Sequence, residues 1–353
     1  MKNYEIAVVP GDGIGKEVIP GAIKVLDQVA SICGFSMSYR EYDYSCEYYL
    51  KNGRMMPEDG MDRLRGHDAI FLGAVGYPGV PDHISLWGLL IPIRRQFKQY
   101  INLRPVRLLK GISSPLKNPG KIDFYIVREN NEGEYSSIGG KLYEGTAEEM
   151  VIQESVFTRK GVDRVMKFAF ELAQSRNGHL TSATKSNGII HTMPFWDERF
   201  QAMGRAFPDV KTDQYHIDIL AAHFVQHPDW FDVVVGSNLF GDILSDLGPA
   251  VVGGMGLAAG ANINPEREFP SMFEPVHGSA PDIAGKGIAN PIACCWTGAM
   301  MLEHLGEKEA SDLILKSIEA LTEESKILTP DLGGTASTSD VVQALISKLR
   351  APK

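Results

Sequence analysis

Two aspartates, Asp242 and Asp246, have the spacing expected of a pair of metal ligands. They follow Asn238, which can cap a helix, and at positions i and i+4 they would share one face of that helix. Their neighbours are Ile, Leu and Phe, a setting in which two carboxylates repel each other unless a cation compensates them. Mg²⁺ and Mn²⁺ take such oxygen ligands. The alternative is that both acids only compensate the helix dipole.

A second group is cationic and consists of Arg94, Arg95, Arg104 and Arg128. The planar guanidinium binds a carboxylate through two parallel hydrogen bonds, so converging arginines would suit a substrate with several carboxylates. Taken singly, each arginine fits the role of a surface salt-bridge partner better than that of a substrate ligand.

Lys185 closes a strand-like run at 180–184. Strand ends are frequent positions of functional side chains in α/β proteins, and a lysine there could act as a base. An ordinary surface lysine is the alternative.

Tyr135, considered alone, is compatible with a simple packing role.

A loop rich in small residues runs from Glu274 to Asp282 and continues to Asn290. The backbone of such a loop can approach a ligand closely. Ser279 lacks the G-x-S-x-G setting of a nucleophile, so the loop is predicted to cradle a ligand instead.

The glycine-rich segment 11–15 follows a buried strand but does not match a dinucleotide fingerprint. Lys16 stands where the G-x-G-x-x-G pattern requires its third glycine. A tight strand-to-helix turn is the alternative interpretation.

Strands and helices alternate around these residues, which favours an α/β architecture with helices covering a sheet. Buried strands are predicted at 6–9, 69–72, 124–127 and 233–235. Helical patterns cover 16–30, 86–98, 160–174, 193–206, 217–225 and 292–305, with two more near the C-terminus. The stretch 253–265, rich in Gly, Ala and Asn, is a natural crossover between domains.

The composition is that of an ordinary globular protein: 353 residues, 44% hydrophobic, 22% charged, with a net charge of −9. No basic face stands out, so we expect no nucleic-acid partner. No signal-peptide pattern or membrane-length apolar run occurs, which predicts a cytoplasmic protein without a membrane partner. The four cysteines form no metal-binding or redox spacing and are predicted to be buried free thiols. They are Cys33, Cys46, Cys294 and Cys295.

Together, these segments resemble the β-decarboxylating dehydrogenases of the isocitrate/isopropylmalate dehydrogenase family. The resemblance covers essentially the whole chain and rests on segments 11–15, 102–105, 127–130, 185–187, 241–246, 274–282 and 290–291. It implies an α/β, two-domain fold distinct from the Rossmann fold. The large cofactor-binding domain would be discontinuous, at 1–100 and 256–353. The small domain, at 101–255, would carry metal and substrate residues and the interface of a homodimer.

The resemblance also implies residue roles. The residues matched to substrate binding are Arg94, Arg104 and Arg128. Tyr135 matches the tyrosine that handles the proton at the carbon losing carbon dioxide, and Lys185 matches the base. The metal carboxylates would be Asp218, Asp242 and Asp246, with Lys185 and Asp218 reaching into the partner subunit's site.

The residues matched to the NAD loop are Glu274, His277, Gly278, Ser279, Ala280, Pro281, Asp282 and Asn290. Asp282 stands where NADP-using isocitrate enzymes carry a lysine. A carboxylate there would repel a 2′-phosphate, so NAD is expected to be preferred over NADP. The resemblance further implies Mg²⁺ or Mn²⁺, and a monovalent cation such as K⁺ could assist.

Substrate choice is predicted from Trp87 and Gly88. Isopropylmalate enzymes place a glutamate at the first position, and isocitrate enzymes place a serine at the second. The runs 82–88 and 45–49 resemble the tartrate/D-malate branch instead. This implies oxidation of tartrate or D-malate, usually with decarboxylation, to oxaloglycolate, D-glycerate or pyruvate. An alternative is a 3-isopropylmalate dehydrogenase, or another member with an altered specificity loop, and Trp87 could be a packing residue.

A catalytically silent nucleotide-binding subunit is disfavoured, because Lys185, Tyr135, Asp242 and Asp246 are all retained. A metal-only lyase is disfavoured by the intact cofactor loop.

Overall fold

The computed structural model describes residues 2–349. Its contacts divide the chain into two compact units. The first comprises Met1–Gln99, Arg107–Lys117 and Pro249–Lys353, and the second comprises Tyr100–Val106 and Asn118–Gly248. The chain therefore leaves the first unit and returns to it.

Five strands of the first unit lie in the order β2-β1-β3-β12-β11. Their bounds are Ser36–Glu41 (β2), Asn3–Gly11 (β1), Ala69–Ala74 (β3), Ser271–Phe273 (β12) and Ala261–Ile263 (β11). All pair in parallel except β11, which is antiparallel to β12. Strand β3 is buried along its whole length, as expected of a parallel strand covered on both faces.

The long helices of the first unit are α1 (Gly15–Cys33), α10 (Ile292–Leu305), α11 (Lys308–Glu324) and α12 (Thr338–Lys348). Helix α10 is buried continuously over its first eleven residues, so it forms the centre of this helical group. Short helices α2 (Cys46–Asn52) and α3 (Gly60–Arg65) follow β2. Short 3₁₀ turns lie at Met255–Leu257 and Pro330–Leu332.

The single helix predicted over 86–98 is wrong in detail. The structure has α4 (Asp82–Ser85), a π-helical turn (Leu86–Leu90) and α5 (Ile91–Gln96). Ile91 donates its N–H to the carbonyl of Leu86, five residues earlier. Pro92 follows at the start of α5 and has no N–H to donate, so the α-helical ladder is interrupted there.

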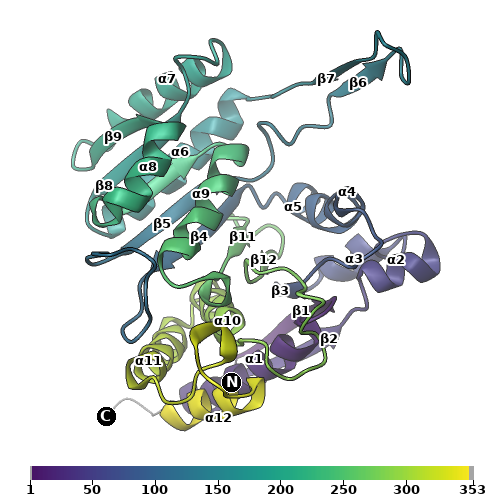
Figure 1. The fold of residues 1–353 in the computed structure, drawn as a ribbon, viewed down its shortest axis with the longest axis vertical. Helices are drawn as coiled ribbons and strands as arrows, with labels where there is room; N and C mark the ends of the chain where they lie inside the picture. The colour runs from purple at the N-terminus through teal and green to yellow at the C-terminus, as the bar shows by residue number, and fades with distance from the viewer. Residues whose placement is uncertain (1, 350–353) are drawn as a thin grey trace. The chain divides into compact units, whose positions relative to one another are not determined.

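The second unit has strands in the order β4-β5-β10-β8-β9 (Figure 1). Their bounds are Ile101–Arg107 (β4), Asp123–Glu129 (β5), Val233–Gly236 (β10), His179–Thr184 (β8) and Lys211–His216 (β9). Strands β5, β10, β8 and β9 are parallel. The helices are α6 (Arg159–Ser175), α7 (Thr192–Gly204), α8 (Ile217–Gln226) and α9 (Asn238–Val251), with a 3₁₀ turn at Pro228–Trp230. The predicted α/β class is confirmed.

An antiparallel hairpin projects from the second unit (Figure 1). It consists of β6 (Gly139–Leu142) and β7 (Met150–Gln153), and every residue of both strands is exposed. Neither strand shows the alternation of a half-buried strand, so the hairpin is not predicted from the sequence.

All four cysteines are free thiols, as predicted. Cys46, Cys294 and Cys295 are buried, whereas Cys33 is only partly buried near the end of α1, so its predicted burial is wrong. Within residues 2–349, no helix is both long and apolar enough to cross a membrane.

Candidate active site

The Gly11–Gly15 turn packs directly against the predicted cofactor loop. Gly11 and Gly13 have φ of 72° and 52°, which favours glycine. A Cβ on Gly13 would lie 2.0 Å from the carbonyl oxygen of Ser279. Ile14 donates its N–H to that same oxygen at 2.8 Å. The glycines are therefore needed for the close approach of two backbones within the first unit.

Two acids around this turn fix its surroundings. The carboxylate of Asp12 is fully buried and accepts from the N–H groups of Cys46 (3.0 Å) and Gly76 (3.1 Å). Glu17, in the first turn of α1, accepts from the N–H groups of Gly285 and Gly287. The turn and α1 thus hold two separate points of the loop that follows Glu274.

Arg94 and Glu274 form a buried ion pair. Arg94 Nη2 lies 2.8 Å from Glu274 Oε1, and each side chain is 8% exposed. Asn262 Nδ2 donates to the same oxygen at 2.8 Å. The predicted substrate arginine is therefore held by a residue of the predicted cofactor loop, a contact that the sequence analysis missed.

The rest of this loop offers both exposed and buried groups. Gly278, Pro281 and Asp282 are exposed, whereas Ser279 is buried. Ala280 has φ of 40°, a sparsely populated conformation outside glycine that marks a constrained loop.

His277 and Asn290 differ in their surroundings. Burial lowers the pKa of His277, which favours the neutral ring. Its Nε2 atom is buried and has no hydrogen-bond partner among the described residues. Asn290 Oδ1 accepts from the N–H of Ile292, the first residue of α10, at 3.0 Å. The orphaned nitrogen and the exposed Asp282 fit a polar ligand such as a dinucleotide.

In the second unit, Tyr135, Arg128 and Asp242 converge. The Tyr135 hydroxyl donates to Asp242 Oδ2 at 2.6 Å, and Arg128 Nη1 pairs with the other oxygen of the same carboxylate. The Arg128 guanidinium also lies 5.4 Å from the centre of the Tyr135 ring. Residues predicted from separate segments are thus brought together on β5, the following loop and α9.

Asn238 holds Arg128 rather than capping α9 as predicted. Asn238 Oδ1 accepts from Arg128 Nε at 3.0 Å and Nη2 at 2.7 Å. The capping hydroxyl is that of Ser237, which accepts from the N–H of Phe240 at 3.4 Å. A Cβ on Gly241 would lie 2.5 Å from Arg128 Cβ, so glycine allows the helix to approach the arginine.

Asp246 lies one turn after Asp242 on α9. Desolvation, and then the neighbouring Asp242 carboxylate, raise the pKa of Asp246 above its usual range. A bound cation would relieve both effects, so this donor pair fits Mg²⁺ or Mn²⁺. Across residues 2–349, no three His, Cys, Asp or Glu side chains are grouped to hold a metal.

Lys185 and Asp218 form a separate pair. Lys185 Nζ lies 2.9 Å from Asp218 Oδ1, and the aspartate side chain is 68% exposed. The lysine hydrogen bond holds the pKa of Asp218 below its usual range. Lys185 directly follows β8 and Asp218 lies in the first turn of α8, so parallel β8 and β9 bring them together.

The remaining substrate-site candidates lie in different units. Arg104 is buried on β4 of the second unit, and its Nε donates to Asn102 Oδ1 at 2.8 Å. Trp87 lies in the π-helical turn of the first unit and is 37% exposed. The guanidinium of Arg95 lies 5.0 Å from the Trp87 ring centre. A Cβ on Gly88 would lie 2.7 Å from Met55 Cγ, which explains why no side chain is present there.

Glu129 is an unpredicted buried acid beside Arg128. Burial raises its pKa to about 7, although it accepts from the N–H groups of Asn131 and Glu132. The ordinary value is 4.5, so between these two pH values the folded protein retains a proton that the unfolded chain loses. The free energy of unfolding should therefore fall as pH rises through this range, by on the order of 3 kcal/mol.

Denaturant unfolding of the wild type and of Glu129→Gln, measured at several pH values between 5 and 8, checks this prediction. The variant should lack the Glu129 part of the pH dependence. A stability difference between the two proteins that does not change with pH would contradict it.

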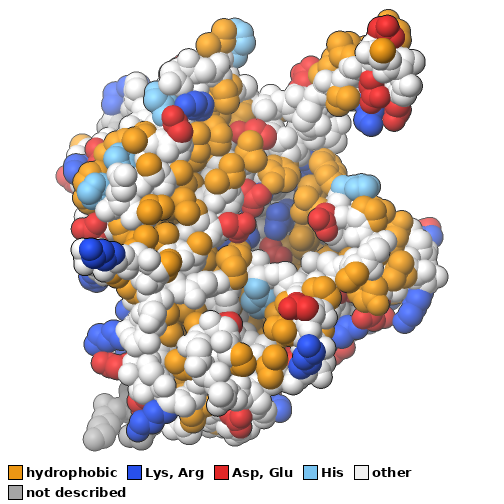
Figure 2. Space-filling view, viewed as in Figure 1, with side chains coloured by type: hydrophobic (Ala, Val, Ile, Leu, Met, Phe, Trp, Pro, Cys, Tyr) orange, Lys and Arg blue, Asp and Glu red, His pale blue; other side chains and the backbone are white. Residues whose placement is uncertain are grey.

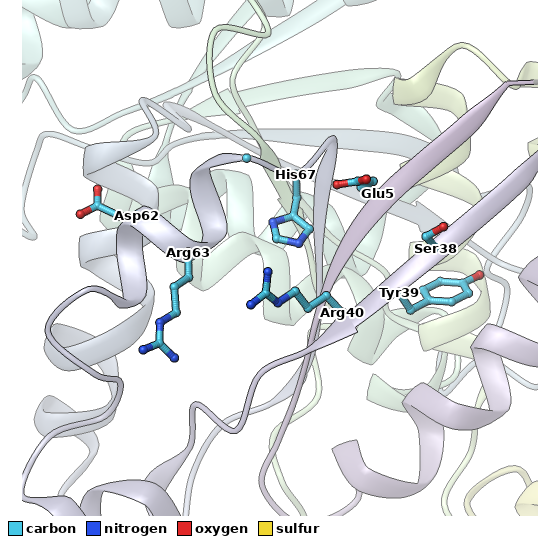
Figure 3. A pocket seen from close by; sticks show the side chains of 8 residues that line it. Glu5, Ser38, Tyr39, Arg40, Asp62, Arg63 and His67 are labelled. Atoms are coloured by element: carbon cyan, nitrogen blue, oxygen red, sulfur yellow. The ribbon is translucent and has the colours of Figure 1, made fainter.

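A hollow of about 520 Å³ in the first unit lies among residues outside the predicted site (Figure 3). It is lined by Glu5, Ser38, Tyr39, Arg40, Asp62, Arg63, Gly66 and His67. Its cations are matched by acids, and Arg63 pairs with Asp59 at 2.9 Å. This balanced surface does not indicate a site for the dicarboxylate expected from the sequence.

Comparisons with known proteins define the class. A model of the isocitrate/isopropylmalate dehydrogenase family matches residues 5–345, and the chain belongs to this family. It is 59% identical to a decarboxylating D-malate dehydrogenase of Escherichia coli, over 98% of both chains. It is 55% identical to a tartrate dehydrogenase/decarboxylase of Pseudomonas putida, again over 98% of both.

The fold is similar to that of a crystal structure of isocitrate dehydrogenase from Methylococcus capsulatus. The TM-score is 0.87 at 32% identity, covering 98% of this chain and 99% of that one. The predicted family and fold are confirmed.

Proposed function

We propose that this protein is a decarboxylating dehydrogenase that oxidises D-malate or tartrate with NAD and a divalent cation. The observation that carries the proposal is the convergence of Tyr135, Arg128 and Asp242 within the second unit. This arrangement combines a proton donor, a carboxylate-binding cation and a metal ligand. The high identity to D-malate and tartrate enzymes over the full chain supports the substrate class.

The residues act on the substrate as follows. Arg94, Arg104 and Arg128 bind its carboxylates. Lys185 takes the proton of the 2-hydroxyl group as hydride leaves C2, and Tyr135 donates a proton to the carbon that has lost carbon dioxide. A bound divalent cation would supply Lewis acidity toward the substrate oxygens, and NAD would supply the hydride acceptor. Asp242 and Asp246 would hold the cation, and the 274–290 loop would hold NAD.

A homodimer with shared sites completes the proposal. In the second unit, apolar side chains are exposed on both α8 and α9, including Ile219, Val225 and Ile243. Figure 2 shows hydrophobic side chains gathered on this unit, and the hairpin adds exposed Leu142 and Val151. Contiguous exposed apolar surface is typical of an interface. The Lys185–Asp218 pair would then be available to a second copy, where Asp218 would act as a further metal ligand.

NADH formation measured across a panel of 2-hydroxy diacids, with and without a metal chelator, tests the function. D-malate and tartrate should be oxidised only when the metal is present. NADP should be a much poorer oxidant, because exposed Asp282 would repel a 2′-phosphate. Preference for isopropylmalate over D-malate in the unmodified enzyme would contradict the substrate assignment and leave the family intact.

Trp87 should limit the size of the C3 substituent, because its indole fills the space and offers no charge to a third carboxylate. Trp87→Ala should raise the kcat/KM ratio of 3-alkylmalates to D-malate by about 10-fold or more, since pocket volume discriminates by one to three kcal/mol per methylene-sized group. Trp230→Ala, at the exposed tryptophan of the second unit, is the matched control and should leave this ratio unchanged. An unchanged ratio in Trp87→Ala would identify Trp87 as a packing residue.

A further inference from the structure

Three glutamates form hydrogen bonds that hold segment 129–135, which carries Tyr135, in place. Glu129 accepts hydrogen bonds from the N–H groups of Asn131 and Glu132 within the segment itself. Glu132 accepts from the N–H and the hydroxyl of Thr158, at the start of α6. Of the three carboxylates, that of Glu134 is the one that accepts hydrogen bonds at the start of α9. The segment is therefore connected separately to its own loop, to α6 and to α9.

The Glu134 carboxylate occupies the N-terminus of α9. Ser237 Oγ donates to Glu134 Oε1 at 2.8 Å, and the N–H of Leu239 donates to Oε2 at 3.0 Å. Helix α9 has 14 residues, and an anion at such a helix start is stabilised by free N–H groups and the helix dipole. The residue directly before Tyr135 is thus bound to the helix that carries Asp242.

Tyr135 is consequently attached to α9 at two positions along the helix axis. Its backbone is joined through Glu134 to Leu239, and its hydroxyl donates to Asp242 at 2.6 Å, within the next turn. Asn238 Nδ2 adds a bond to the carbonyl of Glu132 at 3.0 Å. Gly133 has φ of 79° and passes so close that its Cβ would lie 3.3 Å from Asn238 Cβ. Together, the contacts set the position of the phenol along the helix.

We propose that Glu134 is a positioning residue for proton transfer by Tyr135. The inference rests on the proposed function, in which the Tyr135 O–H bond breaks and a C–H bond forms at the carbon that has lost carbon dioxide. For this transfer, the phenol must lie at the same position along the axis of α9 as the Asp242 and Asp246 carboxylates, which would hold the metal. Glu134 sets this position of the phenol through its hydrogen bonds to Ser237 and Leu239 at the start of α9, and it does not itself touch the substrate.

Replacement by alanine should lower kcat more than it changes KM. Because misplacing a reacting group by about 1 Å costs up to about 100-fold in rate, we expect Glu134→Ala to lose roughly 10- to 100-fold in kcat with D-malate. KM for D-malate and for NAD should stay within about two-fold, since the arginines and the cofactor loop are intact. Glu134→Gln keeps one acceptor oxygen and should recover part of the loss.

A double-variant cycle separates positioning from general support of the fold. If Glu134 acts through the phenol, Glu134→Ala should add little to the loss already caused by Tyr135→Phe. Additive losses in kcat would overturn the proposal.

Ser337→Ala is the matched control for helix capping. Ser337 Oγ accepts from the N–H of Asp340 at 3.2 Å and caps α12, and its hydroxyl donates to the Asp340 carboxylate of the same helix. Both this variant and Glu134→Ala should lose a stabilising contact at a helix N-terminus, seen as a similar fall in Tm. Only Glu134→Ala should lose kcat.

An equal effect of the two variants on kcat would also overturn the inference. A wild-type enzyme that oxidises neither D-malate nor tartrate would instead overturn the proposed function, so the two failures are distinguishable.

Discussion

Asp246→Ala should abolish most activity at ordinary metal concentrations, and excess Mn²⁺ should restore part of it. Loss of an outer-shell partner of a metal ligand already costs about 10- to 100-fold, so loss of a direct ligand should cost at least about 100-fold. Asp246 lies one turn from Asp242, and desolvation, followed by repulsion from the Asp242 carboxylate, raises the pKa of Asp246. The variant should show a higher Mn²⁺ concentration for half-maximal activity, while KM for NAD stays unchanged.

Glu171→Ala is a suitable control. Glu171 is an exposed helix acid whose partner, Lys167, lies at 3.6 Å, so only a surface charge is lost. Unchanged activity and unchanged chelator sensitivity in Asp246→Ala would mean that the aspartates are ordinary charges on a helix face.

Mixing Lys185→Ala with Tyr135→Phe subunits, each of which retains only residual activity, should regenerate activity. If Lys185 serves the partner's site, each hybrid dimer has one intact site and one that lacks both groups. Random exchange makes half of the dimers hybrids, so about one quarter of wild-type activity is expected. NADH formation, measured after subunit exchange has been verified by mass, gives this fraction.

The matched control mixes Lys185→Ala with Asp218→Ala. Both residues come from the same exposed pair, so every site in these hybrids lacks one of them and no activity should return. Absence of recovery in the first mixture would place all of the catalytic groups in one chain's own site.

The sequence predicted those parts of the fold that depend on local pattern. Val233–Gly236 is a continuous buried run, and Lys185 follows a strand, so both could be located from hydrophobic periodicity and strand ends. Asp242 and Asp246 share a helix face because four residues make about one turn. These signals are contained within a few neighbouring residues.

Other features depend on residues far apart in the chain. Arg94 and Glu274 are 180 positions apart, and no local pattern relates them. Glu134 resembles any surface acid until its contact with Ser237 is known, 103 positions away. The hairpin could not be predicted, because its apolar residues are exposed and do not belong to a hydrophobic core of the described chain.

The π-helical turn at Leu86–Leu90 has an evolutionary consequence. A π turn contains one residue more than the α-helical turn that it replaces. Deleting a single residue there would leave the flanking helical segments in nearly the same orientation and change the directions of the side chains within residues 86–90. Trp87 would then face a different direction, although its own codon is unchanged. Insertion and deletion, as well as substitution, are thus a short mutational route by which relatives of this protein could exchange one substrate for another.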